Sequence, residues 1–324
     1  MARSDEILDA WLDRAHDDER WRAWFAPRAG GSAKRAADEV VEAAERHAAR
    51  LVEAVRPRTR TKRGREMSSD LARRSRAAFA KIKPRIEAQV MRAARLEMES
   101  AVRDLERLMP GQMIVLPSAS ELRAAASAPF EGGTLRQWLD GLAAKVARTA
   151  RERVVAGAQR GDSEASVRRR LAGRRGVAAE AKRDGASIAR TAAIHAQAAA
   201  RELVLQKNRG SFARVLYVAI LDHRTTATCR ALDGKVFPVG KGPRPPMHFN
   251  CRSTTVPILK GEQPPDRVTY AGWLRRQPRA VQDEALGKAR ARLWRSGRLA
   301  LDGMVDQSYR PLTLDQIRRR RGLD

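Results

Sequence analysis

Both cysteines of the chain lie in one short stretch, together with two of its five histidines. Cys229 comes first, and His248 and Cys251 follow as a His-x-x-Cys pair. Thiolate and imidazole groups are good zinc ligands, and a structural zinc site takes four ligands in a tetrahedral arrangement. These three residues supply three of them. We expect the fourth from Asp222, in preference to His223 or a water molecule.

The spacing differs from that of a standard zinc finger, because Cys229 has no Cys or His partner two to four residues away. Two interpretations therefore stay open. In the first, Asp222, Cys229, His248 and Cys251 hold a structural zinc ion. In the second, the stretch is a metal-free β-knot in which Asp222 and His248 bond backbone amides.

The same residues form no recognised catalytic pattern. A zinc ion with three protein ligands and an open water would need a general base such as Asp222 or Asp233 within reach, but neither stands in a known catalytic spacing. A Cys–His nucleophile pair would lack an orienting third group. The sequence also has no phosphate-binding loop, no dinucleotide fingerprint and no His-Glu-x-x-His motif. We therefore predict no catalytic residues and no enzyme activity.

The elements around these residues are predicted to be short strands. The run from Arg214 to Leu221 is rich in β-branched and aliphatic residues and predicts a buried strand. Residues 235–239 and 253–258 are two further strand candidates. Residues 225–232 suit one or two helical turns, and Asp233-Gly234 indicates a turn. The sequence thus predicts a small β-rich motif over about residues 214–258.

The rest of the chain is predicted to be helical, with apolar residues at helical spacing over 5–25, 32–55, 69–109, 134–156, 177–207 and 269–294. We expect the first helix to break at residues 27–31, which contain Pro27, and a basic non-helical linker at 56–65, which contains Pro57 and Gly64. Much of the apolar surface is alanine, which lets helices approach closely. The fold class is therefore α+β, with mostly long α-helices and one small β-rich motif.

The chain is strongly basic. It has 65 Lys and Arg against 38 Asp and Glu, a net charge of +27 in 324 residues. A charge of this size repels itself unless anions lie nearby, which indicates a polyanionic partner such as DNA, RNA, a membrane surface or an acidic protein. The alternative is the arginine usage of a GC-rich genome. Residues 56–65 are read either as a contact to phosphate or as a solvated hinge.

The composition also bears on the compartment. Two cysteines argue against a disulfide scaffold. No apolar run approaches the roughly 20 residues that span a bilayer, and the N-terminus lacks the apolar segment of a signal peptide. We expect a protein made in a reducing cytosol, without a membrane partner.

The order of residues in the central stretch resembles a known family, the Mu F-like minor head proteins of tailed phages, also called head morphogenesis proteins. The resemblance is clearest over about residues 134–260. Ser253 stands where many members have a third cysteine, which places more weight on Asp222 as a ligand. The matching residues are Asp222, Arg224, Thr225, Cys229, Leu232, Asp233, Gly234, Pro245, Pro246, His248, Asn250, Cys251 and Arg252.

The resemblance implies a low-copy virion component inside the head near the portal vertex, made in the host bacterial cytoplasm. Its implied partners are the portal protein, capsid or scaffold proteins and packaged double-stranded DNA bound non-specifically. It also implies a head morphogenesis domain (111–260) followed by a C-terminal helical extension (261–324). Residues 1–110 match no motif of the family, and we expect them to form an N-terminal helical arm with a basic linker. The alternatives are a phage-borne zinc-dependent hydrolase or toxin, and a sequence-neutral DNA-binding protein.

Overall fold

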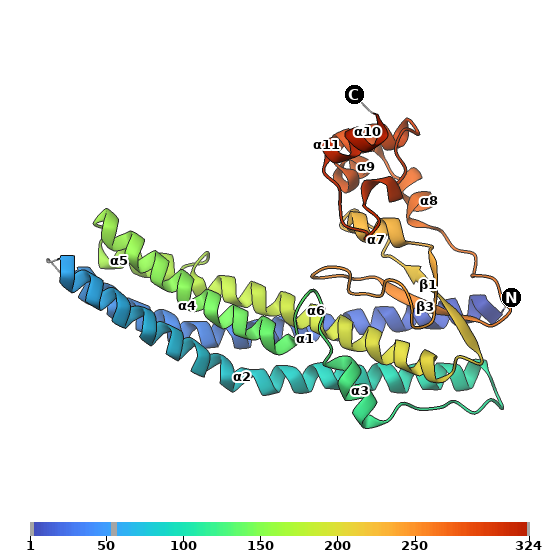
Figure 1. The fold of residues 1–324 in the computed structure, drawn as a ribbon, viewed down its shortest axis with the longest axis horizontal. Coiled ribbons are helices and arrows are strands. Elements are labelled where there is room, and N and C mark those ends of the chain that lie inside the picture. The colour runs from blue at the N-terminus through green and yellow to red at the C-terminus, as the bar shows by residue number, and fades with distance from the viewer. Residues whose placement is uncertain (1–2, 53–56, 323–324) are drawn as a thin grey trace. The chain divides into compact units, whose positions relative to one another are not determined.

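The computed structural model describes residues 3–52 and 57–322 (Figure 1). Within the helices, the side chains of residues 3–5, 7, 13–25, 30, 47–52, 57–61 and 108 are not described. The helices are α1 (Arg3–Val52), α2 (Pro57–Leu108), α3 (Ala119–Ala126), α4 (Leu135–Arg160), α5 (Glu164–Ala172), α6 (Val177–Lys207), α7 (Ala227–Leu232), α8 (Tyr270–Arg275), α9 (Arg279–Leu286), α10 (Lys288–Arg295), the 3-10 helix η1 (Asp302–Met304) and α11 (Leu314–Arg321).

The predicted fold class is confirmed: the chain is mostly helical, and its strands form one small antiparallel sheet. The strands are β1 (Phe212–Val218), β2 (Val236–Pro238) and β3 (Thr254–Leu259), in the order β2-β1-β3. Val215 pairs with Phe237 on one side and with Pro257 on the other. Each strand lies within two or three residues of its predicted place. The helical turns predicted before the Asp233-Gly234 turn are also present, as α7.

The predicted break at residues 27–31 is wrong, because α1 continues through it as one helix. A proline inside a helix removes one backbone hydrogen bond and costs about 3 kcal/mol. Pro27 is exposed, whereas Ala26, Ala29 and Ala33 are buried on the inner face of the helix. Tertiary packing supplies most of the stability of protein helices, so it outweighs this local cost.

The predicted non-helical linker at 56–65 is also wrong over the part that the structure describes, because α2 begins at Pro57. Proline is favoured at the first position of a helix, where its missing N–H would have no partner. Arginine and lysine are good helix formers, so a basic stretch does not by itself interrupt a helix. Asp70 lies inside α2 and pairs with Arg73 and Arg74 at 2.5 and 2.8 Å.

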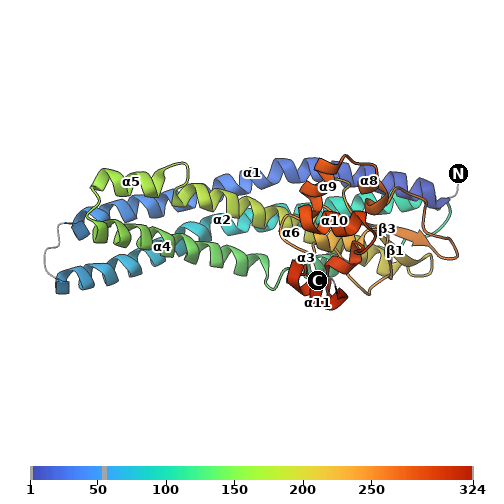
Figure 2. The same ribbon diagram turned by 90° about the horizontal axis from the view of Figure 1, so that it is seen from above.

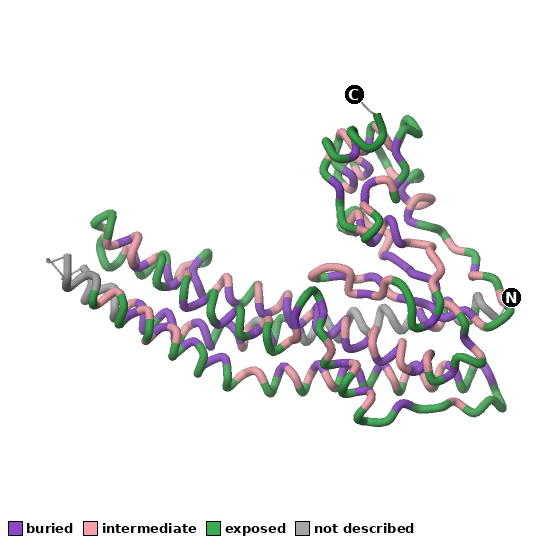
Figure 3. Tube along the Cα trace, in the orientation of Figure 1, coloured by how far each residue is buried: buried purple, intermediate pink, exposed green. Residues whose placement is uncertain are grey.

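The described chain divides into two compact units, and α1, α2 and α6 contribute residues to both. The unit of Glu19–Arg95 and Arg123–Ala196 is a bundle in which parts of α1, α2, α4 and α6 run side by side (Figures 1 and 2). Its interior is lined largely by alanine, as predicted; α6 alone buries Ala178, Ala181, Ala189, Ala192, Ala193 and Ala196. Buried and exposed residues recur in turn along the coloured parts of these helices (Figure 3).

The second unit, Met1–Asp18, Leu96–Leu122 and Gln197–Asp324, contains the sheet. Apolar residues cover both faces of the sheet. Leu216 of β1 belongs to a cluster with Trp11 of α1, Leu105 of α2 and Val204 of α6. Tyr217, the next residue of β1, belongs to a separate cluster with Cys229. This alternation is the geometry of a strand, whose successive side chains point to opposite faces.

A buried ion pair joins the helices of this unit to the sheet. The Nε atom of Arg201 donates to Glu97 Oε1 at 2.7 Å, and their side chains are only 4% and 0% exposed. The same guanidinium donates to the hydroxyl of Thr254 at the start of β3 and lies 5.1 Å from the ring centroid of Trp11. Residues of α1, α2, α6 and β3 therefore meet at one charged group.

No helix in the described part of the chain is both long enough and apolar enough to cross a bilayer.

Replacing Glu97 with glutamine is expected to lower the free energy of unfolding by about 3–5 kcal/mol, because the guanidinium of Arg201 would remain buried without its counter-charge. Urea denaturation followed by circular dichroism measures this change. The matched control is Glu39→Gln, which breaks an ion pair with Lys81 whose side chains are 55% and 68% exposed. That change should cost at most about 1 kcal/mol. Equal losses in the two variants would contradict the assigned role of the buried pair.

Candidate metal centre

The cysteine and histidine side chains are positioned by three adjacent pieces of chain. Cys229 lies on α7, whose N-terminus is capped by the Thr226 hydroxyl accepting from the Cys229 amide. His248 and Cys251 lie in the loop between β2 and β3, and the Cys251 amide donates to the His248 carbonyl at 3.2 Å. Tyr217 of β1 reaches the same point, with its hydroxyl 3.3 Å from Cys229 Sγ.

The ligand atoms of Cys229, His248 and Cys251 all lie within 4.8 Å of one another, and within the described residues this is the only such cluster of His, Cys, Asp or Glu. Cys229 Sγ is 3.2 Å from His248 Nε2 and 3.8 Å from Cys251 Sγ. Two thiolates at about 2.3 Å from one tetrahedral ion would lie about 3.8 Å apart. A disulfide would require about 2.0 Å, so both residues are free thiols. The group could therefore bind a metal ion.

The backbone around His248 sets its tautomer. His248 Nδ1 is 2.9 Å from the carbonyl oxygen of Phe249, which can only accept a hydrogen bond. Nδ1 therefore carries the proton, and the lone pair of Nε2 faces the cysteines. This is the arrangement in which a histidine serves as a metal ligand, with its other nitrogen oriented by the backbone.

The two thiols differ in how readily they ionise. Contact with Cys229, and then the neighbouring His248, lowers the pKa of Cys251 well below its usual value although burial opposes this. The contact with Cys251 and burial together raise the pKa of Cys229. Burial also raises the pKa of Tyr217, whose hydroxyl stays protonated. Cys251 is therefore the more acidic of the two thiols, and a metal ion would favour the thiolate form of both.

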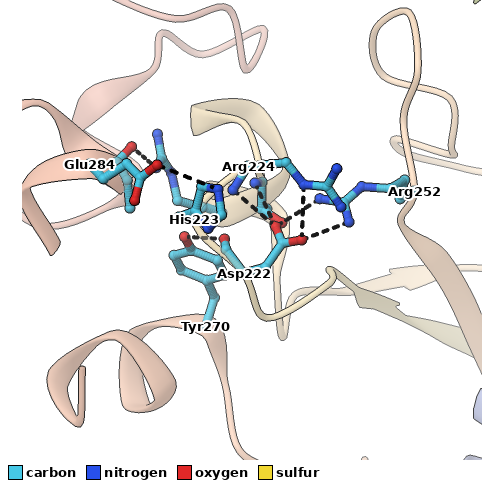
Figure 4. Close-up of polar contacts among 9 residues, drawn as sticks. Asp222, His223, Arg224, Arg252, Tyr270 and Glu284 are labelled. Atoms are coloured by element: carbon cyan, nitrogen blue, oxygen red, sulfur yellow. Dashed lines mark hydrogen bonds and ion pairs between the residues drawn. The ribbon is translucent and has the colours of Figure 1, made fainter. Parts of the chain in front are cut away.

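Asp222, the predicted fourth ligand, lies outside this group. Its carboxylate makes a two-pronged ion pair with Arg252, at 2.7 Å for each oxygen (Figure 4). The Oδ1 atom also accepts from the amides of Arg224 and Thr225 at 3.0 Å. Burial alone would raise the pKa of this carboxyl, but the bonds and charge of Arg252, followed by Thr225 and Arg224, lower it to about 2.

His223, the alternative ligand, is directed elsewhere as well. Its Nε2 atom is 3.6 Å from Glu284 Oε1, on the surface (Figure 4). The structure thus brings three of the four predicted residues together and pairs the fourth, Asp222, with an arginine. Asp222 still supports the site, because it fixes the loop before α7 through Thr225 and ties it to Arg252, the neighbour of Cys251.

Sequence reasoning missed several residues that shape the centre. Tyr217 was assigned only to the buried strand, yet its hydroxyl contacts Cys229. Asp233 was considered as a general base, but its side chain is 1% exposed and is held by Arg267 at 3.0 Å and by the amides of Ala219 and Tyr270 at 2.8 and 2.7 Å. Arg252, the partner of Asp222, was missed as well. Its one signal in the sequence is that it directly follows Cys251.

Acid should weaken the fold partly through Asp222. Its pKa is about 2 when folded, against 3.8 as the reference value, so its stabilising contribution is complete above about pH 4 and is lost as the pH falls towards 2. The stability difference between the wild type and Asp222→Asn should therefore shrink over this range. Urea midpoints at several pH values measure it, with the exposed Asp266→Asn as control. A difference that does not change with pH would refute this role.

One comparison with known proteins found a match. Residues 148–256, about a third of the chain, match the family model described as Phage Mu protein F like protein. The matched range runs from α4 through β3 and includes Cys229, His248 and Cys251. Searches of curated proteins and of solved structures found no match. The resemblance seen in the sequence is thereby confirmed over residues 148–256, which are similar to the Phage Mu protein F family.

Proposed function

We propose that this protein is a low-copy minor head protein of a tailed phage, associated with the portal and involved in procapsid assembly and in DNA packaging or ejection. The observation that carries the proposal is the family match over residues 148–256. In this proposal residues 111–260 are the head morphogenesis domain. Residues 1–110 form a helical arm, and residues 261–324 are a C-terminal extension.

The charge of the chain supports a location beside packaged DNA. A net charge of +27 is favourable where phosphates are dense, because each phosphate contact releases a condensed counterion. Lys62 and Arg65, near the start of α2, are exposed, as are Arg318, Arg319, Arg320 and Arg321 in α11. Such contacts read no bases, so we propose that double-stranded DNA is bound without sequence preference.

Purified phage particles should contain a few copies of this protein per head. Quantitative mass spectrometry against the major capsid protein measures the ratio. Particles made without the gene should differ in portal incorporation or DNA content, and complementation with the wild-type gene should restore both. The absence of the protein from intact particles would overturn the proposal.

We also propose that Cys229, His248 and Cys251 hold a structural zinc ion. The donor set supports zinc, since soft thiolates and an imidazole select it over magnesium or calcium. The separation of 3.8 Å between the sulfur atoms also fits a shared tetrahedral ion. In this role the ion links α7 to the loop before β3.

The protein purified from zinc-supplemented cells should carry about one zinc ion per chain, and Cys251→Ser should lose most of it. Elemental analysis measures the content. A chelator should lower the melting temperature of the wild type and leave that of Cys251→Ser nearly unchanged. The matched control is His223→Gln, which removes a histidine outside the cluster and should keep its zinc. Wild-type protein that retains no zinc would refute the metal centre.

A further inference from the structure

The cluster supplies three ligand atoms, whereas a tetrahedral ion takes four. Both side chains proposed from the sequence as the fourth ligand are occupied: the oxygens of Asp222 each lie 2.7 Å from Arg252, and His223 faces Glu284. Drawing Asp222 to the metal would leave the partly buried guanidinium of Arg252 without its carboxylate, which is costly in a protein interior.

A small cavity lies beside the cluster. It has a volume of about 20 Å³, which is enough for one water molecule because such a molecule needs about 10–15 Å³. Cys229 and His248 are among the residues that line it. The remaining lining is mostly polar and includes Thr225, Thr226, Asn250 and Ser253. A polar cavity of this size holds one water-sized donor atom, and because the cavity is partly open to solvent, the rest of a small anion can extend outward.

The cavity also has a positive border. Arg224 and Arg252 both line it, and the side chain of Arg224 is 68% exposed. Arg252 is paired with Asp222 at 2.7 Å, whereas Arg224 is 3.6 Å from that carboxylate. Arg224 therefore contributes positive charge at a position open to solvent, and its field favours anions over neutral ligands.

We propose that the fourth coordination position of the metal centre opens into this cavity and takes a small exogenous ligand, either solvent or a monoanion attracted by Arg224. This inference rests on the metal centre proposed above and adds to it an exchangeable position. The ion would still link α7 to the loop before β3 through three protein ligands, and its fourth position would take a water molecule or small anion, as in zinc sites that have three protein ligands.

The test uses the full chain with Co²⁺ in place of zinc, because tetrahedral Co²⁺ bound by thiolates absorbs visible light. Azide is the probe. Titration should change the visible bands in a saturable way, with one azide bound per chain. Arg224→Gln should raise the apparent Kd for azide by about threefold or more, since it removes one nearby positive charge. Arg319→Gln, which removes an exposed arginine of α11, should leave the Kd unchanged.

A second variant separates the open position from a closed one. If the position is open, Asp222→Asn should still bind Co²⁺ although it loses a loop anchor, and its visible bands should still respond to azide. A wild-type spectrum that does not respond to azide would overturn the inference, and the more so if that of Asp222→Asn does respond, because Asp222 would then be the fourth ligand. That outcome would leave the metal centre intact. Wild-type protein that retains neither Co²⁺ nor zinc would instead refute the centre and this inference with it.

Discussion

The buried ion pair between Arg201 and Glu97 is the interaction on which the unit containing the sheet depends. Two opposite charges that are almost wholly removed from water are stable only while each keeps its partner. Arg201 also donates a hydrogen bond to Thr254, the first residue of β3, and its guanidinium lies against the ring of Trp11. The position of α6 therefore sets the position of β3. Cys251 lies just before β3 in the chain, so this contact also bears on the metal centre.

The carboxylates around the metal centre act as loop anchors. Asp222 holds the turn before α7 and pairs with Arg252, and Asp233 holds the turn after α7 and pairs with Arg267. Tyr270 links the two, because its amide donates to Asp233 and its hydroxyl donates to the Asp222 carbonyl at 2.8 Å. The first residue of α8 is thus fixed to both ends of the segment that carries Cys229. This accounts for the C-terminal helices packing next to the centre.

The two compact units use different means of stabilisation. The bundle is packed through alanine, which loses no side-chain entropy on burial but covers little area. Its helices are long, since residues 19–52 of α1 and 57–95 of α2 lie in the bundle. The unit that contains the sheet has mostly shorter helices and strands. It relies on buried polar groups in addition to apolar clusters. The candidate metal centre lies among these polar groups.

Much of this could be predicted from the sequence by itself. A short run of β-branched and aliphatic residues located the buried strand, and the alanine stripes indicated close helix packing. The Cys and His residues pointed to the cluster, because their types and spacing are local properties of the chain. The continuity of α1 through Pro27, and the start of α2 at Pro57, could not be predicted, because packing against distant helices outweighs a local helix breaker.

The partner of Asp222 was decided only by the tertiary structure. From the sequence, that carboxylate could serve a metal, a backbone amide or any nearby cation, and nothing in its neighbours distinguishes them. Folding places Arg252 at 2.7 Å from both of its oxygens, and a two-pronged charged bond of this kind is stronger than a neutral hydrogen bond. The sequence by itself therefore determined which residue types could serve as ligands. Only the tertiary structure decided which of these residues contact one another, because those distances exist only in the folded chain.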